Sequence, residues 1–274
     1  FAKHPDESLL QVDSEEVGVG DVVTEEKLAF MFLGNVLHDG VPGVKSASGE
    51  KSCGLIDCYE FKADLSDRAS LQRGAAVFVN YCQGCHSAMY SRYERVATDL
   101  GIPLDLAEQN LIFDDTKIGD LMDNAMPKPL SKKWFGATPP DLTLVARARG
   151  ADWLYTYLLT FYIDDKRPWG VNNRVFKDVG MPHVLLELQG VQRCLPGEDP
   201  GHEPCAVLEH FPDSGALTAD EYRQTIGDLT NFMVYMAEPA ALVRYRIGLY
   251  VLLFLAFFLV FAWLLNREYW KDVH

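Results

Sequence analysis

The residues best suited to chemistry in this sequence lie at positions 81–86, which read YCQGCH. They contain a C-x-x-C-H motif, the attachment signal for a c-type haem. Two cysteines at this spacing can each add across one vinyl group of a haem, and the following histidine can bind the iron through a neutral imidazole. The motif therefore predicts one haem c, bound covalently through Cys82 and Cys85, with His86 as an axial ligand.

Two other kinds of site could use the same cysteines. A structural zinc site needs a second Cys or His pair at similar spacing, and the sequence contains no other C-x-x-C and no H-x-x-x-H. A thioredoxin-like redox pair needs a βαβ context, whereas the segments on both sides of the motif are typical of helices. Haem attachment is the favoured interpretation.

The second axial ligand of the iron is less sharply defined. Met122, Met126, Met181 and His183 are candidates, and a vacant position, as in a haem sensor or peroxidase, is a further alternative. Met126 and Met181 each precede a proline, which favours an extended loop suited to presenting a ligand. The spacing from His86 favours Met181, because the chain between the two ligands must be long enough to pass over the edge of the haem. A thioether ligand favours ferrous iron, and iron with two protein ligands only transfers electrons.

Two amphipathic helices are expected to position the motif. The first covers residues 66–81 with Ser66 as its N-cap, and the second covers residues 218–236 and opens with a Thr-x-x-Glu capping box. Gly74 lies within the apolar stripe of the first helix, where a glycine costs about 1 kcal/mol relative to alanine. We therefore expect the two helices to cross at Gly74.

Other elements are expected between these two helices. Residues 90–99 are expected to be helical, residues 139–142 form a turn that leads into a helix through Arg149, and residues 153–162 are apolar nearly all round and should be buried.

Residues 247–265 are 19 uncharged and almost wholly apolar residues. As a helix they would span about 28 Å, enough to cross a bilayer. Tyr245, Trp263, Tyr269 and Trp270 suit the membrane interfaces. We predict a membrane helix over residues 244–266, followed by a tail over residues 267–274.

The composition narrows the choice of partners. The 274 residues carry a formal net charge of −14, which excludes nucleic-acid binding and favours a cationic partner. Residues 1–62 form an acidic extension, with a short buried helix expected over residues 27–37. Because residues 1–6 contain no apolar stretch, we expect a mature chain whose export signal has been removed.

The four cysteines outside the motif fall into two close pairs, Cys53 with Cys58 and Cys194 with Cys205. Such pairs are typical of disulfides formed in an oxidising compartment. Buried free thiols are the alternative.

Four segments together resemble one protein family: SLQRGAAVFVNYCQGCHS, ATPPDLTLVARARG, VGMPHVLLELQG and REYWKDVH. From residue 66 to the end, the chain resembles the cytochrome c1 family in its proteobacterial form. The resemblance implies a mainly α fold: a class I cytochrome c-like haem domain with long loop insertions over residues 63–243, plus one C-terminal transmembrane helix.

The resemblance also implies roles for single residues. Met181 would be the sixth ligand, Arg149 would pair with a haem propionate and Pro140 would line the haem pocket. Trp153 stands near a position where other members carry a tyrosine beside the propionates, which leaves that contact open. A disulfide between Cys194 and Cys205 would brace the ligand loop.

The implied function is electron transfer in ubiquinol–cytochrome c reductase, the respiratory complex III. Electrons would pass from a Rieske iron–sulfur protein through the haem to a cytochrome c at an acidic surface, with no side chain acting as acid, base or nucleophile. The helix would anchor the chain beside a cytochrome b subunit in a dimeric complex. The head would face the periplasm and the C-terminus the cytoplasm of a bacterial inner membrane. A stand-alone, membrane-tethered mono-haem cytochrome c that feeds an oxidase is the alternative.

Overall fold

The computed structural model describes residues 52–53, 56–195, 205, 207–212 and 214–271. Most of the acidic extension, including the helix expected over residues 27–37, therefore lies outside the described residues. The chain divides into two compact units, one ending at Ala237 and the other covering Glu238–His274.

The first long helix of the described chain, α2, covers Arg68–Val77 and continues as a π-helical turn, η2, over Phe78–Cys82. Its N-cap is Asp67, whose side chain accepts a hydrogen bond from the Ser70 backbone N–H at 3.0 Å. The expectation that Ser66 caps this helix was wrong by one residue, because the Ser66 hydroxyl donates to Asp64 Oδ1 at 2.6 Å instead.

The helix near the end of the head, α9, covers Ala219–Ala237. The predicted capping box is confirmed: the Thr218 backbone N–H donates to Glu221 Oε2 at 2.8 Å, and the Glu221 backbone N–H donates to Thr218 Oγ1 at 3.4 Å. The C-terminal half of α9 is almost completely buried, which makes it the central helix of the core.

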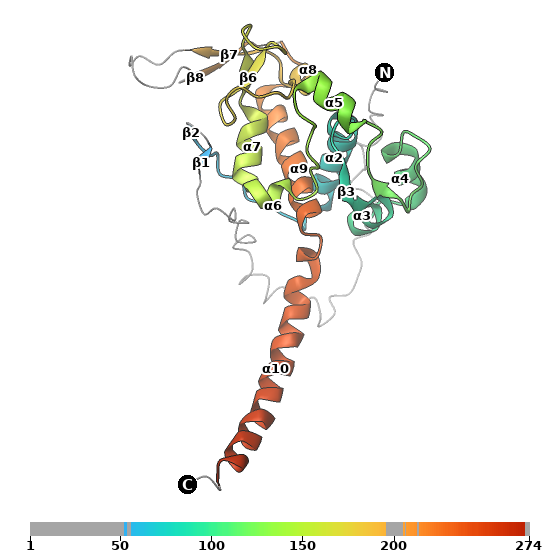
Figure 1. Ribbon diagram of the computed structural model, residues 1–274, viewed down its shortest axis with the longest axis vertical. Coiled ribbons are helices and arrows are strands. Elements are labelled where there is room, and N and C mark those ends of the chain that lie inside the picture. Colours follow the sequence, from blue (N-terminus) through green and yellow to red (C-terminus); the bar gives the residue numbers. More distant parts are fainter. Residues whose placement is uncertain (1–51, 54–55, 196–204, 206, 213, 272–274) are drawn as a thin grey trace, which may run out of the picture. The chain divides into compact units, whose positions relative to one another are not determined.

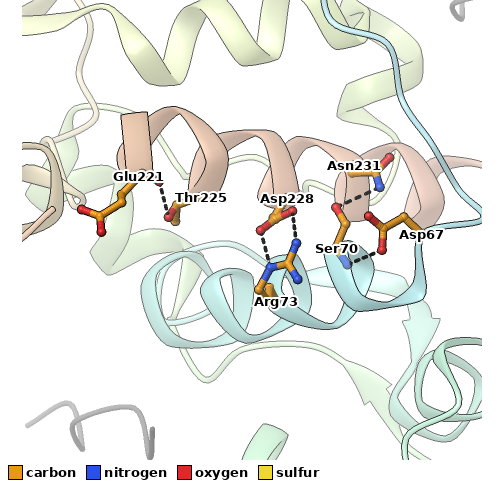
Figure 2. Close-up of polar contacts among 7 residues, drawn as sticks. All are labelled: Asp67, Ser70, Arg73, Glu221, Thr225, Asp228 and Asn231. Atoms are coloured by element: carbon orange, nitrogen blue, oxygen red, sulfur yellow. Dashed lines mark hydrogen bonds and ion pairs between the residues drawn. The ribbon is translucent and has the colours of Figure 1, made fainter. Parts of the chain in front are cut away.

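The crossing of α2 and α9 at Gly74 is also confirmed. A Cβ atom at this position would lie 2.1 Å from the carbonyl oxygen of Asp228, so only glycine lets the two backbones come so close. Figure 2 shows the polar contacts that flank this crossing: Arg73 donates two hydrogen bonds to the Asp228 carboxylate, at 2.7 and 3.0 Å, and Asn231 donates to the Ser70 hydroxyl at 3.2 Å.

Shorter elements follow α2 around the head (Figure 1). In chain order they are β3 (Ala88–Arg92), α3 (Tyr93–Leu100), α4 (Leu104–Leu111), β4 (Leu121–Met122), α5 (Lys128–Phe135), α6 (Val145–Arg149) and α7 (Ala151–Leu159). The helix expected over residues 90–99 starts only at Tyr93, because the residues before it pair with β4 in an antiparallel ladder. The mainly helical fold that was predicted is confirmed.

A small sheet with strand order β6-β5-β7-β8 completes the head. Its strands are β5 (Phe161–Ile163), β6 (Val171–Asn173), β7 (Gln192–Leu195) and β8 (Val207–His210), with α8 (Leu186–Gln189) before β7. The apolar run predicted over residues 153–162 is buried or half-buried throughout, but its end leaves α7 and enters β5.

Both predicted cysteine pairs are disulfides, Cys53–Cys58 and Cys194–Cys205. Cys194 belongs to β7, so its disulfide lies at the β7–β8 hairpin, whereas Cys53–Cys58 connects β1 (Ser52–Cys53) to the residue after β2 (Ile56–Asp57).

The segment after the first disulfide is fastened to α7. The Tyr59 N–H donates to Thr156 Oγ1 and the Phe61 N–H to Asp152 Oδ1, both at 2.8 Å, while the Phe61 ring stacks on Tyr155 with centroids 5.0 Å apart. This segment is therefore part of the head and packs on α7.

The second unit contains the helix α10, Ala241–Tyr269. Within its stretch Arg246–Tyr269, the most apolar 18-residue window has a mean hydropathy of 2.7, and no part of that window is buried. In the described chain this is the one helix long and apolar enough to cross a membrane, in agreement with the predicted membrane helix.

Candidate haem site

The C-x-x-C-H motif forms a tight turn at the end of α2. After η2, the backbone N–H groups of Cys85 and His86 both donate to the carbonyl oxygen of Cys82, at 3.1 and 2.9 Å. The two thiols form no disulfide, and burial raises the pKa of Cys82 to about 12 and also raises the pKa of Cys85. Because a reactive redox pair needs a lowered thiol pKa, this environment argues against a thioredoxin-like site.

His86 is buried and its imidazole is oriented by a single backbone group. The ring Nδ1 lies 2.7 Å from the carbonyl oxygen of Pro140. Since a carbonyl only accepts, Nδ1 carries the proton and Nε2 keeps its lone pair for a metal. Burial lowers the pKa of His86 despite the opposing effects of Pro140 and Asp141, so the ring is the neutral donor that iron requires.

Asp141 holds the Pro140 loop against the haem motif. Its carboxylate accepts hydrogen bonds from the Ser87 hydroxyl at 2.9 Å, the Met89 backbone N–H at 2.8 Å and the Thr143 backbone N–H at 3.0 Å. Burial alone would raise the pKa of Asp141, but these hydrogen bonds outweigh it and lower the pKa. Sequence analysis assigned Asp141 no role, although this residue lies in ATPPDLTLVARARG, one of the four segments that resemble the family.

A cavity of about 370 Å³ opens beside the motif, within the range of cofactor pockets, roughly 300–1,000 Å³. All six residues predicted for the site lie on its wall: Cys82, Cys85, His86, Pro140, Arg149 and Met181. The other lining residues are mostly apolar and come from η2, the end of α5, the loop between α5 and α6, α6, α7, the loop before α8, and α9. Such a wall suits a flat, apolar macrocycle.

The sulfur of Met181 has a defined partner in this cavity. The Tyr157 hydroxyl donates to Met181 Sδ at 3.4 Å, and Met181 packs against the cluster of Phe161, Val171 and Val179. The adjoining loop is closely packed, since a Cβ atom on Gly180 would lie 3.3 Å from the carbonyl oxygen of Phe135.

The other candidate ligands named from the sequence do not line the cavity. Met122 is buried in the core. His183 stacks on Phe161 with centroids 4.7 Å apart, its Nε2 lies 2.5 Å from Gln189 Oε1, and burial lowers its pKa to about 4. Met233 of α9 was not among the candidates named from the sequence, but the structure places it on the cavity wall.

Arg149 is the one permanently charged residue among those that line the cavity. Its guanidinium carbon lies 5.2 Å from the centre of the Trp153 ring, a cation–π contact. A single guanidinium on an apolar wall suits a ligand with carboxylates at one edge. In the described part of the chain no cluster of three His, Cys, Asp or Glu could hold a metal ion.

Known proteins match this chain over most of its length. Residues 60–189 and 210–273 match the model of the Cytochrome C1 family. The cytochrome c1 of Allochromatium vinosum is 55% identical over 213 residues, which cover 77% of this chain and 87% of that one. The chain belongs to the cytochrome c1 family.

Two further likenesses differ in strength. An ammonia monooxygenase gamma subunit of Nitrosomonas europaea is 43% identical over 247 residues, which cover 90% of this chain and 99% of that one. A solved structure of a hyperthermophilic respiratory Complex III aligns over 97% of this chain and 92% of that chain, but at a TM-score of 0.36 and 16% identity it carries no argument.

Family membership implies a haem c cofactor, and the residues on the cavity wall fit that group. Membership of this family and the apolar helix α10 together make the chain a membrane-anchored subunit.

Proposed function

We propose that the chain is the electron-transfer subunit of the respiratory ubiquinol–cytochrome c reductase and carries one haem c, attached through Cys82 and Cys85. The observation that supports this most directly is the gathering of both cysteines, His86 and Met181 on one apolar cavity in a member of the cytochrome c1 family. When bound, the haem supplies reversible one-electron chemistry at its iron.

The protein's part is to bind and insulate this group. His86 and Met181 would both bind the iron, which would leave no position on it for a substrate. The apolar wall excludes water, Pro140 fixes the His86 tautomer, and Arg149 would pair with a propionate of the bound haem. No side chain acts as acid, base or nucleophile, so the rate of the relay depends on distance and on relative potential.

The electron acceptor is a cationic cytochrome c, and an acidic segment of the head suits it. Residues 104–123 carry six exposed carboxylates and one cation, Lys117. This segment ends beside the haem motif, because the Gln83 side-chain amide lies 3.4 Å from the Asp123 carbonyl oxygen. Complementary charges on two redox proteins speed their encounter and make its rate fall with salt.

This docking surface can be tested by charge reversal. Changing Asp115 to lysine should lower the second-order rate of cytochrome c reduction at low salt and flatten its salt dependence. Glu209→Lys on β8, which is also exposed, is the matched control. Equal effects of the two changes would rule out residues 104–123 as the docking surface.

The proposed function also specifies the neighbouring subunits and the side of the membrane on which the head lies. The chain stands beside a cytochrome b subunit in a dimeric complex and receives its electron from a Rieske iron–sulfur protein. The head faces the periplasm of a bacterial inner membrane and the residues after α10 face the cytoplasm, because haem is attached outside the cytoplasmic membrane. The two disulfides agree with an oxidising compartment. Protease added outside spheroplasts should therefore digest the head.

Two measurements test this function. Alkaline pyridine treatment of the denatured chain should show one haem c per polypeptide, and the Cys82→Ala, Cys85→Ala double variant should retain none. Purification by a tag on this chain should recover b-type haem and a Rieske electron paramagnetic resonance signal in fixed proportion. Recovery of the c haem without either partner would favour a stand-alone tethered cytochrome c.

A further inference from the structure

The Tyr157 hydroxyl donates a hydrogen bond to the Met181 sulfur at 3.4 Å. Tyr157 lies on α7 and its own ring is held on two sides. It stacks on Trp153 with centroids 5.0 Å apart and planes 7° apart, and it meets Phe161 edge-on at 5.1 Å. The hydroxyl is therefore placed by rigid aromatic packing on a regular helix.

A thioether sulfur can use both of its lone pairs at once. One can bind iron while the other accepts a hydrogen bond from a neutral phenol. Such a hydrogen bond withdraws electron density from the sulfur, which then donates less to the metal. Ferric iron depends more on that donation than ferrous iron does, so the bond favours the reduced state.

We propose that Tyr157 is a positioning residue that holds the Met181 sulfur for the iron and raises the reduction potential through the hydrogen bond to Sδ. The proposal rests on the assignment of Met181 as the sixth ligand in the proposed function.

The packing around the loop before α8, which contains Gly180 and Met181, supports a fixed position for the sulfur. Met181 packs against Phe161 and Val179, and Phe161 is the residue that the Tyr157 ring meets. Gly180 has the Phe135 carbonyl as a close neighbour. The loop backbone is thus confined, and the phenol adds a directional contact to the sulfur atom itself.

Tyr157→Phe tests the proposal, because it removes only the hydroxyl and keeps both ring contacts. In the full chain with its haem, the methionine–iron charge-transfer band should persist. At a fixed solution potential the ratio of reduced to oxidised haem should fall about two- to tenfold, as expected for the loss of one hydrogen bond.

Tyr155→Phe is the matched control. Tyr155 lies on the same helix, stacks on Phe61 and does not line the cavity, so removing its hydroxyl should leave the ratio unchanged. If both variants shifted the ratio equally, a general effect on α7 would replace the proposed one.

A double-variant cycle separates this proposal from the ligand assignment on which it rests. In a Met181→His background the sulfur is absent, so Tyr157→Phe should no longer change the ratio. Absence of the charge-transfer band from the wild type would overturn the ligand assignment. A wild type with the band, and a Tyr157→Phe variant whose ratio equals that of the wild type, would overturn the role of Tyr157 alone.

Discussion

The imidazole Nδ1 of His86 lies 2.7 Å from the carbonyl oxygen of Pro140, 54 residues further along the chain. This contact joins the haem-attachment turn to the loop before α6 and selects the tautomer whose free nitrogen can bind iron. The loop is held in turn by Asp141, whose carboxylate accepts hydrogen bonds from Ser87 and Met89. Histidine orientation therefore depends on a carboxylate that does not touch the imidazole.

Replacing Asp141 with asparagine should loosen this arrangement. The amide keeps one acceptor oxygen but places an NH2 group against hydrogen-bond donors, so we expect a loss of about 2 kcal/mol in unfolding free energy. This loss can be measured by unfolding the haem-loaded chain with guanidinium in detergent and following the Soret band. Asp115→Asn in the exposed acidic segment is the control and should change stability by less than about 0.5 kcal/mol.

The same carboxylate predicts a pH dependence. The pKa of Asp141 is lowered in the folded protein, so its stabilising effect is present above the unfolded pKa of about 4. It is lost as pH falls through the lower folded value. The stability difference between wild type and Asp141→Asn should therefore shrink on acidification below pH 4. A difference that stays constant or widens there would contradict this account of the Asp141 hydrogen bonds.

The helix crossing gives a second prediction. Gly74→Ala places a Cβ atom 2.1 Å from a backbone oxygen of α9, so the helices must separate, at a cost of more than about 3 kcal/mol. At Gly227 on α9 a Cβ atom would meet only the Phe61 ring at 3.5 Å. Gly227→Ala should thus be neutral or stabilising by up to about 1 kcal/mol. Thermal unfolding of both variants measures the contrast, and equal Tm values would refute the close approach at Gly74.

The single charge on the cavity wall gives a third prediction. If Arg149 pairs with a haem propionate, its positive charge stabilises the ferrous state, which carries one positive charge less than the ferric state. Arg149→Gln should therefore lower the midpoint potential, by about 40 mV for an interaction of about 1 kcal/mol. Arg149→Lys keeps the charge and should lower it by less. Redox titration of both variants measures these midpoint potentials. An unchanged potential in Arg149→Gln would place the guanidinium away from the haem.

The first disulfide gives a fourth prediction. Cys53–Cys58 closes a short loop next to the segment that is fastened to α7. Changing both cysteines to alanine should cost about 2 kcal/mol of stability, while the haem spectrum stays the same, because the backbone hydrogen bonds of Tyr59 and Phe61 remain. Loss of haem, or a shifted potential, would instead indicate that this disulfide shapes the cavity.

Much of the site could be predicted from the sequence because its chemistry is encoded locally. Cys82, Cys85 and His86 are adjacent, so their spacing alone indicates haem attachment. The crossing at Gly74 followed from one glycine in an apolar stripe, where only a nearby backbone makes it favourable. Spacing already favoured Met181 as the second ligand, but placing Arg149 and Pro140 at the same cavity required the resemblance to a family.

What sequence analysis missed depends on tertiary contacts. The partnership of Tyr157 with Met181 arises only where α7 meets the loop before α8, and nothing in the alternation of apolar residues marks it. Met233 lies on the helix expected over residues 218–236 and was not named as a candidate ligand, yet a buried helix can pack on one side and line a cavity on the other. The helix start at Tyr93 was missed because pairing with β4 overrides the local helical pattern.

The ferric near-infrared spectrum of the full haem-loaded chain tests the central claim most directly, because a methionine–iron bond gives a charge-transfer band there. Two thioethers line the cavity, so the comparison is between Met181→Leu and Met233→Leu. The account predicts that the band is present in the wild type and in Met233→Leu and is lost in Met181→Leu. A band that survives Met181→Leu, or disappears in Met233→Leu alone, would contradict it.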